Sequence, residues 1–166
     1  MDIGSHAAPA RTPKEPIPRP ALLLGWAGVI PFAALSAALL TGFEPVQDIA
    51  LRGLPGYAAV ILGFMGGVQW GLEMSRPEPV HNSPDAWWRS GYAMSVLPAL
   101  LAAAALLLAP PDALLLLAAG FAALLAYDLM RARAGIGPAW YARLRIALTC
   151  AVLAALTAAV YALHHA

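Results

Sequence analysis

Five long apolar segments limit what this chain can fold into more than any other feature. They span about residues 21–42, 55–74, 88–109, 112–131 and 140–163. Each reaches about 20 residues, the length that an α-helix needs to cross a hydrocarbon core of about 30 Å. A single segment surrounded by lipid satisfies its backbone hydrogen bonds only as a helix. The sequence therefore predicts an all-α integral membrane bundle of five transmembrane helices over residues 21–163.

Composition supports this class and excludes several others. The chain is 61% hydrophobic and 11% charged, whereas a soluble domain carries about 25% charged residues. A net charge of +1 argues against a nucleic-acid partner, which favours a strongly basic face. The sequence holds no Cys/His spacing of a metal site, no catalytic Ser/His/Asp set and no phosphate-binding loop. We therefore expect no metal, no cofactor and no enzymatic activity.

Charge placement predicts an orientation. Residues 1–20 contain five prolines and scattered charges, which indicates a disordered cytoplasmic tail. With five crossings, one side of the membrane carries Arg11, Lys14, Arg19, Arg76, Arg89, Arg131, Arg133, Arg143 and Arg145, and the other side carries Arg52. Because Lys and Arg accumulate on the cytoplasmic side, we expect the N-terminus in the cytoplasm and the C-terminus outside.

Aromatic pairs stand where two helices are predicted to begin. Trp87 and Trp88 open the third segment, and Trp140 and Tyr141 open the fifth. Amphipathic rings favour the headgroup zone of the bilayer. The sequence therefore predicts that these four residues anchor the protein at the membrane interface.

Glycines in the second segment follow a helical spacing. Gly63, Gly67 and Gly71 form one stripe, with Gly66 and Trp70 beside it. This small-xxx-small pattern permits close backbone approach between membrane helices. It predicts a glycine zipper that packs against other helices of the bundle or against a second copy of the chain. The opposite side is assigned to lipid and holds Ile61, Met65, Val68 and Leu72.

Polar side chains gather near the predicted cytoplasmic ends of the helices. Gln69 and Glu73 are four residues apart and therefore share a helix face. The candidate cluster comprises Gln69, Trp70, Glu73, Asp128, Arg131, Arg143 and Arg145, with an expected Asp128–Arg131 pair at i,i+3. One interpretation is a charge layer that locks helix ends together. The other is a ligand or proton site that opens to the cytoplasm, since ionisable groups inside a membrane often serve function.

Four stretches resemble a known family. They are L-G-W-A-G-V-I-P-F at 24–32, G-Y-A-A-V-I-L-G-F-M-G-G-V-Q-W-G-L at 56–72, Y-D-L-M-R-A-R at 127–133 and W-Y-A-R-L-R-I-A-L-T at 140–149. Together they resemble the membrane family called domain of unknown function 3429. The resemblance implies a small multi-pass protein of a bacterial or mitochondrial inner membrane, and it implies no activity, cofactor or catalytic residue. The Ala-, Leu- and Arg-rich composition favours a bacterial inner membrane.

Three functions fit these features. The favoured one is a non-enzymatic accessory, assembly or interaction protein that resides in the lipid bilayer and binds another membrane protein or a second copy of itself. The alternative is a small oligomeric transporter or channel that uses Gln69 and Glu73. The third is an intramembrane enzyme that acts on lipid, with Glu73 or Asp128 as the base.

Overall fold

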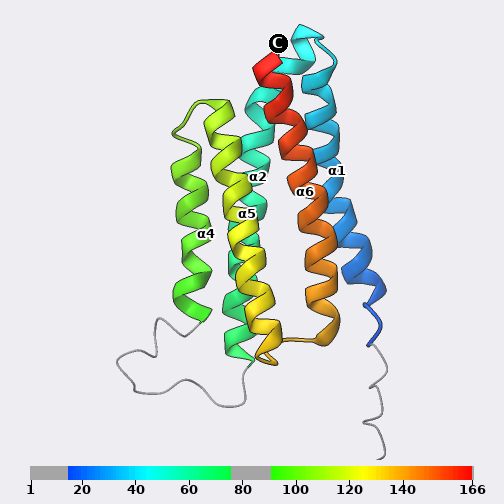
Figure 1. Cartoon of the computed structure of the whole chain (residues 1–166), viewed down its shortest axis with the longest axis vertical. Coiled ribbons are helices and arrows are strands. Elements are labelled where there is room, and N and C mark those ends of the chain that lie inside the picture. The colour runs from blue at the N-terminus through cyan, green and yellow to red at the C-terminus, as the bar shows by residue number, and fades with distance from the viewer. Residues whose placement is uncertain (1–14, 76–90, 166) are drawn as a thin grey trace, which may run out of the picture.

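The protein is an up-and-down bundle of helices in a computed structural model that describes residues 15–75 and 91–165 (Figure 1). The helices are α1 (Arg19–Leu40), α2 (Glu44–Met74), α4 (Gly91–Ala105), α5 (Pro110–Arg133) and α6 (Ala139–His165). No strand occurs within these described ranges. The predicted all-helical architecture is therefore confirmed.

Helix length and composition make this a multi-pass membrane protein. α1, α2, α5 and α6 are each long and apolar enough to cross a membrane. The described part of α4 is apolar but has 15 residues, which gives it a length of about 22 Å. Its predicted start near residue 88, like the predicted anchors Trp87 and Trp88, lies outside the described residues.

α2 begins well before its predicted start. It starts at Glu44 rather than near residue 55, with Pro45 in its first turn, where the missing N–H of proline costs no hydrogen bond. Pro55 lies buried inside the helix and does not begin it. The 31 residues of α2 span about 46 Å, so its first turns, with Glu44, Asp48 and Arg52, extend beyond an apolar stretch of ordinary length.

Short links hold neighbouring helices antiparallel. Gly42 between α1 and α2 has φ +69°, and Gly137 before α6 has φ +91°, conformations that glycine adopts without steric cost. Pro110 and Pro111 open α5 directly after the extended residue Ala109. These links bring the start of α1 to one end of the bundle and the end of α6 to the other (Figure 1).

The core is apolar and runs along the bundle axis. Leu54, Leu62, Leu117 and Leu156 are fully buried, and the ring of Phe32 packs edge-on against Phe121 with centroids 5.9 Å apart. Ile61 and Met65 are partly buried against this core. Their predicted assignment to lipid is therefore wrong, because α2 is rotated so that this side faces its neighbours.

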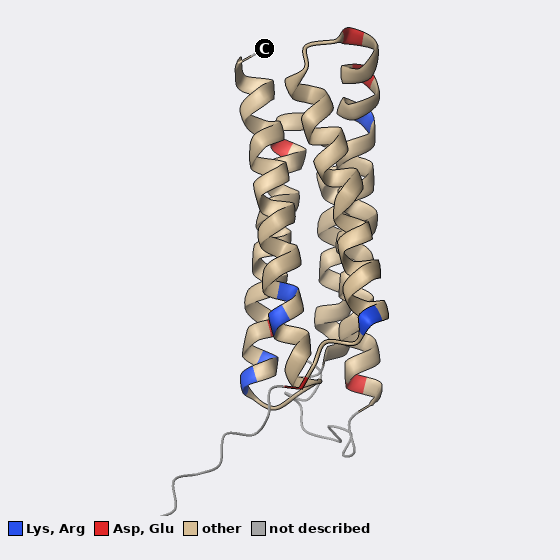
Figure 2. Ribbon diagram, turned by 90° about the vertical axis from the view of Figure 1, so that its right-hand side faces the viewer, with Lys and Arg blue, Asp and Glu red and all other residues tan. Residues whose placement is uncertain are grey.

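Charge is unevenly distributed between the two ends of the bundle. The end with the α5–α6 link carries most of the basic side chains, whereas the opposite end is mainly acidic (Figure 2). The described residues at the basic end include Arg19, Arg131, Arg133, Arg143 and Arg145, and those at the other end include Glu44, Asp48, Arg52 and Asp112. The grouping of arginines predicted from five crossings is thus reproduced for the described residues.

Candidate functional site

A polar layer crosses the bundle near its basic end. It consists of Gln69 and Glu73 on α2, Asp128 and Arg131 on α5, and Arg145 on α6. No member is more than 5% exposed. Burial of a charge among apolar helices is costly unless it is paired and hydrogen-bonded. The arrangement of partners therefore decides what the layer does.

Glu73 and Arg131 form the outer of two ion pairs. Arg131 Nη2 lies 3.0 Å from Glu73 Oε2, and the backbone N–H of Gly91 donates to the same oxygen at 3.1 Å. Arg131 Nη1 also donates to the hydroxyl of Tyr127 at 3.3 Å. The carboxylate of Glu73 thus ties the C-terminal end of α2 to both α4 and α5.

Asp128 and Arg145 form the inner pair. Arg145 Nε donates to Asp128 Oδ2 at 2.6 Å, and the side-chain amide of Gln69 donates to Asp128 Oδ1. Arg145 Nη1 contacts the sulfur of Met65 at 2.7 Å. One carboxylate therefore joins α2, α5 and α6, and its pairing with the guanidinium of Arg145 offsets part of the cost of burying these two groups.

Two predicted members of the cluster lie elsewhere. Trp70 is half-exposed and packs edge-on against Tyr92 with centroids 4.9 Å apart. Arg143 is exposed and donates to the backbone carbonyl of Glu15. The expected i,i+3 pairing of Asp128 and Arg131 is replaced by one partner from another helix for each residue. Side-chain spacing along one helix identified the residues but not their partners.

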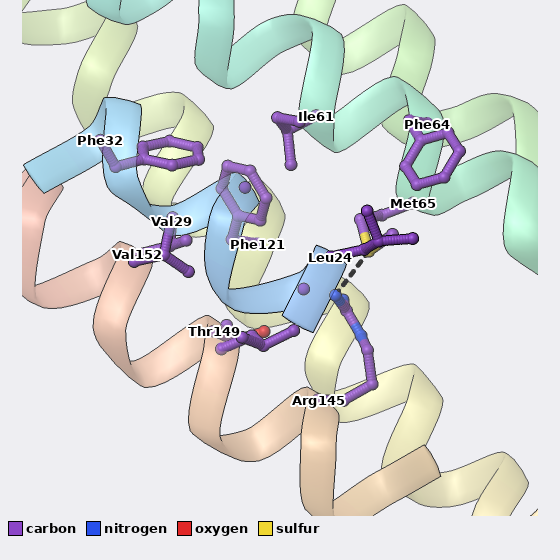
Figure 3. A pocket seen from close by; sticks show the side chains of 13 residues that line it. Leu24, Val29, Phe32, Ile61, Phe64, Met65, Phe121, Arg145, Thr149 and Val152 are labelled. Atoms are coloured by element: carbon purple, nitrogen blue, oxygen red, sulfur yellow. Dashed lines mark hydrogen bonds between the residues drawn. The ribbon is translucent and has the colours of Figure 1, made fainter. Parts of the chain in front are cut away.

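A pocket adjoins the inner pair. It has a volume of about 120 Å³ and lies among α1, α2, α5 and α6 (Figure 3). Arg145 and Thr149 line it, and Arg145 Nη2 and Thr149 Oγ1 are buried without a hydrogen-bond partner among the described residues. Sequence reasoning missed Thr149, although it stands four residues after Arg145 and therefore on the same helix face.

The glycines of α2 divide between two environments. Gly66 is buried, and a Cβ added to it meets the backbone oxygen of Ser95 at 2.5 Å. Gly63 faces Ala99 at 3.7 Å, whereas a Cβ on Gly67 or Gly71 meets no described atom within 4 Å. The predicted zipper stripe therefore does not pack as one unit against the described residues. Of its glycines and Gly66, Gly63 and Gly66 contact the described part of α4.

The predicted anchors within the described residues sit at the start of α6. Trp140 and Tyr141 are half-buried, and their ring centroids are 6.2 Å apart. The Tyr141 hydroxyl is buried without a hydrogen-bond partner among the described residues. Across residues 15–75 and 91–165, no group of three or more His, Cys, Asp or Glu side chains is placed to hold a metal ion.

Comparisons with known proteins agree with the fold. Residues 17–161 match the family described as "Protein of unknown function (DUF3429)". A relative, transmembrane protein 69 of Xenopus tropicalis, is 38% identical over 136 residues, which are 80% of this chain and 50% of that protein. The chain thus spans about half the length of this relative, and no solved structure matches it significantly. Because the family match covers nearly the whole bundle, this multi-pass membrane protein belongs to that family of proteins of unknown function.

Proposed function

We propose that the chain is a non-enzymatic accessory protein that binds a transmembrane helix of another membrane protein through the outer face of α2. This outer face consists of Phe64, Gly67, Trp70, Gly71 and Met74, all exposed. The observation that carries the proposal is the open space at two of these positions. A Cβ on Gly67 or Gly71 meets no atom of the described residues within 4 Å.

The outer face suits a helix rather than lipid tails alone. Gly67 and Gly71 stand one helical turn apart and form a shallow depression between larger side chains. Lipid tails offer no hydrophobic drive for helix association, so close backbone contact must supply it. Glycine also weakens a helix by about 1 kcal/mol relative to alanine. Exposed glycines in the last two turns of α2 therefore favour a role in contact with a partner helix.

The polar layer supports a structural role for its own residues. Glu73 and Asp128 are each held by an arginine from another helix, and Gln69 donates to Asp128. A proton carrier or a general base needs an available lone pair and access to its substrate. These contacts weigh against the transporter and the lipid-acting enzyme, because both would use the same acids.

Location and orientation complete the proposal. The chain resides in a bacterial inner membrane with its basic end toward the cytoplasm. The excess of arginines at the end with the α5–α6 link supports this orientation. The start of α1 then lies on the cytoplasmic side, and the end of α6 lies outside.

Photocrosslinking in native membranes tests the proposal. A photoreactive amino acid in place of Met74, which is 67% exposed on the outer face, is expected to give a crosslink to one other membrane protein. Replacement of both Gly67 and Gly71 by leucine fills the depression and should abolish this crosslink.

The matched control is Gly56→Leu. Gly56 also lies in α2, and a Cβ there meets no atom of the described residues within 4 Å, but it stands eleven residues before Gly67, about 16 Å away along the helix axis. This variant should keep the crosslink. A crosslink only to lipid, or only to a second copy of the chain, would overturn the accessory role.

A further inference from the structure

The pocket beside the inner ion pair has one polar end and one apolar end. Arg145 reaches from α6 toward Met65 on α2, and Thr149 lies one turn farther along α6 (Figure 3). Deeper in the bundle the lining becomes apolar, with Phe32, Phe121 and Val152. An amphipathic molecule therefore has a defined direction in this pocket.

The polar end offers hydrogen-bond donors that the protein itself does not use. Arg145 Nη2 and Thr149 Oγ1 lack a partner among the described residues, and the residues are 4% and 1% exposed. Arg145 Nη1 contacts only the thioether of Met65, which is a weak acceptor. Buried donors of this kind are normally satisfied. An acceptor oxygen placed between the guanidinium and the hydroxyl would satisfy both.

Charge balance limits the ligand to a neutral molecule. The cation of Arg145 is already paired with Asp128 at 2.6 Å, and Arg131 is paired with Glu73. A carboxylate or phosphate in the pocket would therefore add an uncompensated negative charge to an apolar site, which is strongly unfavourable. A carbonyl oxygen accepts hydrogen bonds without adding charge.

The volume of the pocket and the position of its opening further limit the class of ligand. A cavity of roughly 150 Å³ holds a benzene ring, and this pocket has about 120 Å³. Two of its lining residues, Leu24 at 74% and Phe64 at 65%, are largely exposed. They mark an opening on the membrane side between α1 and α2. The pocket is somewhat smaller than that cavity, so a single ring fits with one edge in the opening, and a long apolar tail continues past these side chains into lipid.

From these observations we infer that the pocket binds the ring of a membrane quinone. One ring carbonyl accepts hydrogen bonds from Arg145 Nη2 and the Thr149 hydroxyl. The ring lies against Phe32 and Phe121, and the tail passes between Leu24 and Phe64. The inference concerns binding alone and does not rest on the accessory role, although Phe64 belongs both to the outer face of α2 and to the exit for the tail.

Photoaffinity labelling of the purified full chain tests this site. The probe is an azido-benzoquinone with a ten-carbon tail, and decylubiquinone is the competitor. We expect label on residues that line the pocket, with loss of label when decylubiquinone is in excess. Thr149→Val keeps the side-chain shape and removes the hydroxyl, so it should raise the half-saturating probe concentration about fivefold.

A second variant fills the pocket without touching the ion pair. A Cβ on Gly28 meets only the Tyr57 hydroxyl, at 4.0 Å, so Gly28→Leu should fold and reduce labelling at least about tenfold. Thr157→Val is the matched control, because the hydroxyl of Thr157 is exposed and donates to the Leu153 carbonyl instead. It should leave labelling unchanged. The thermal unfolding midpoint of each variant checks that it is folded.

Three outcomes would overturn the inference. If both Thr149→Val and Gly28→Leu leave the labelling unchanged, the probe does not bind in this pocket. Competition by palmitate or by phosphatidylethanolamine, with none by decylubiquinone, assigns the pocket to an acyl lipid instead. If the probe is incorporated equally in micelles with the native chain and in protein-free micelles, the chain does not bind the probe.

Discussion

The inner and outer faces of α2 differ in every physical respect, although their residues alternate within one short run of sequence. On the inner face Gly66, Gln69 and Glu73 are buried and contact α4 and α5. On the outer face Gly67 and Trp70 are exposed, and each is the immediate neighbour of an inner residue. Since consecutive residues differ by about 100° around a helix, a rotation of about 100° would exchange the two faces.

Polar side chains, rather than glycine spacing, fix this rotation. The zipper spacing selects Gly63, Gly67 and Gly71, yet among the described helices only the first of these glycines has a neighbour within 4 Å of its added Cβ. Gln69 and Glu73 lie on the face that is buried, because each reaches a charged partner on α5. In a lipid environment an unpaired carboxylate is far more costly than an exposed glycine. The polar pair therefore determines which side of α2 turns inward.

The largest expected effect comes from removing a charge on the inner face. Glu73→Ala leaves the guanidinium of Arg131, whose side chain is 6% exposed, buried without its carboxylate. Breaking a buried pair in this way costs about 3–5 kcal/mol. We expect a loss of this size in the free energy of unfolding, measured in mixed micelles by titration with a denaturing detergent.

The double variant Glu73→Leu with Arg131→Leu provides the control. Replacing both partners of a buried pair by apolar residues is often neutral, so most of the lost stability should return. Equal destabilisation in the single and the double variant would show that the ion pair is not the source of the effect. The rotation of α2 would then need another explanation.

The second expected effect compares two neighbouring glycines. In Gly66→Ala the new Cβ meets Ser95 O at 2.5 Å and the ring of Pro98 at 3.1 Å. Overpacking against backbone costs about 1–3 kcal/mol, so we expect a lower unfolding free energy. In Gly67→Ala the Cβ points into open space, and helix propensity should raise stability by about 0.5–1 kcal/mol. If the unfolding free energy changed in the same direction in both variants, the two faces of α2 would not differ in packing.

The helices and most of the polar layer could be predicted from the sequence, because apolar length and side-chain spacing are properties of single segments. Apolar length alone predicts the five helices found among the described residues. The start of α2 was missed because Glu44, Asp48 and Arg52 lie before the apolar stretch that begins near residue 55, although they belong to the same helix. Arg143 and Arg145 were both assigned to the cluster, yet residues two apart point to different sides of a helix, and only Arg145 is buried.

Which acid pairs with which arginine could not be predicted from spacing within one helix. Spacing favours Asp128 with Arg131, but in the folded bundle Arg131 reaches Glu73 and Arg145 reaches Asp128. These contacts depend on how each helix is rotated relative to its neighbours, which no single segment encodes. The pocket follows from the same rotations, because its lining comes from four helices.

The smallest expected effect tests the outer face alone. Trp70 is 47% exposed, and the ring of Tyr92 is the aromatic neighbour that it meets edge-on, at 4.9 Å. In a membrane, lipid replaces the lost ring without the penalty that water would impose, so Trp70→Ala should cost only the aromatic contact, about 0.5–1.5 kcal/mol. Trp70→Phe keeps a ring at this position and should lose less. A loss as large as that of Glu73→Ala would mean that Trp70 is buried, and that the two faces of α2 are not distinct.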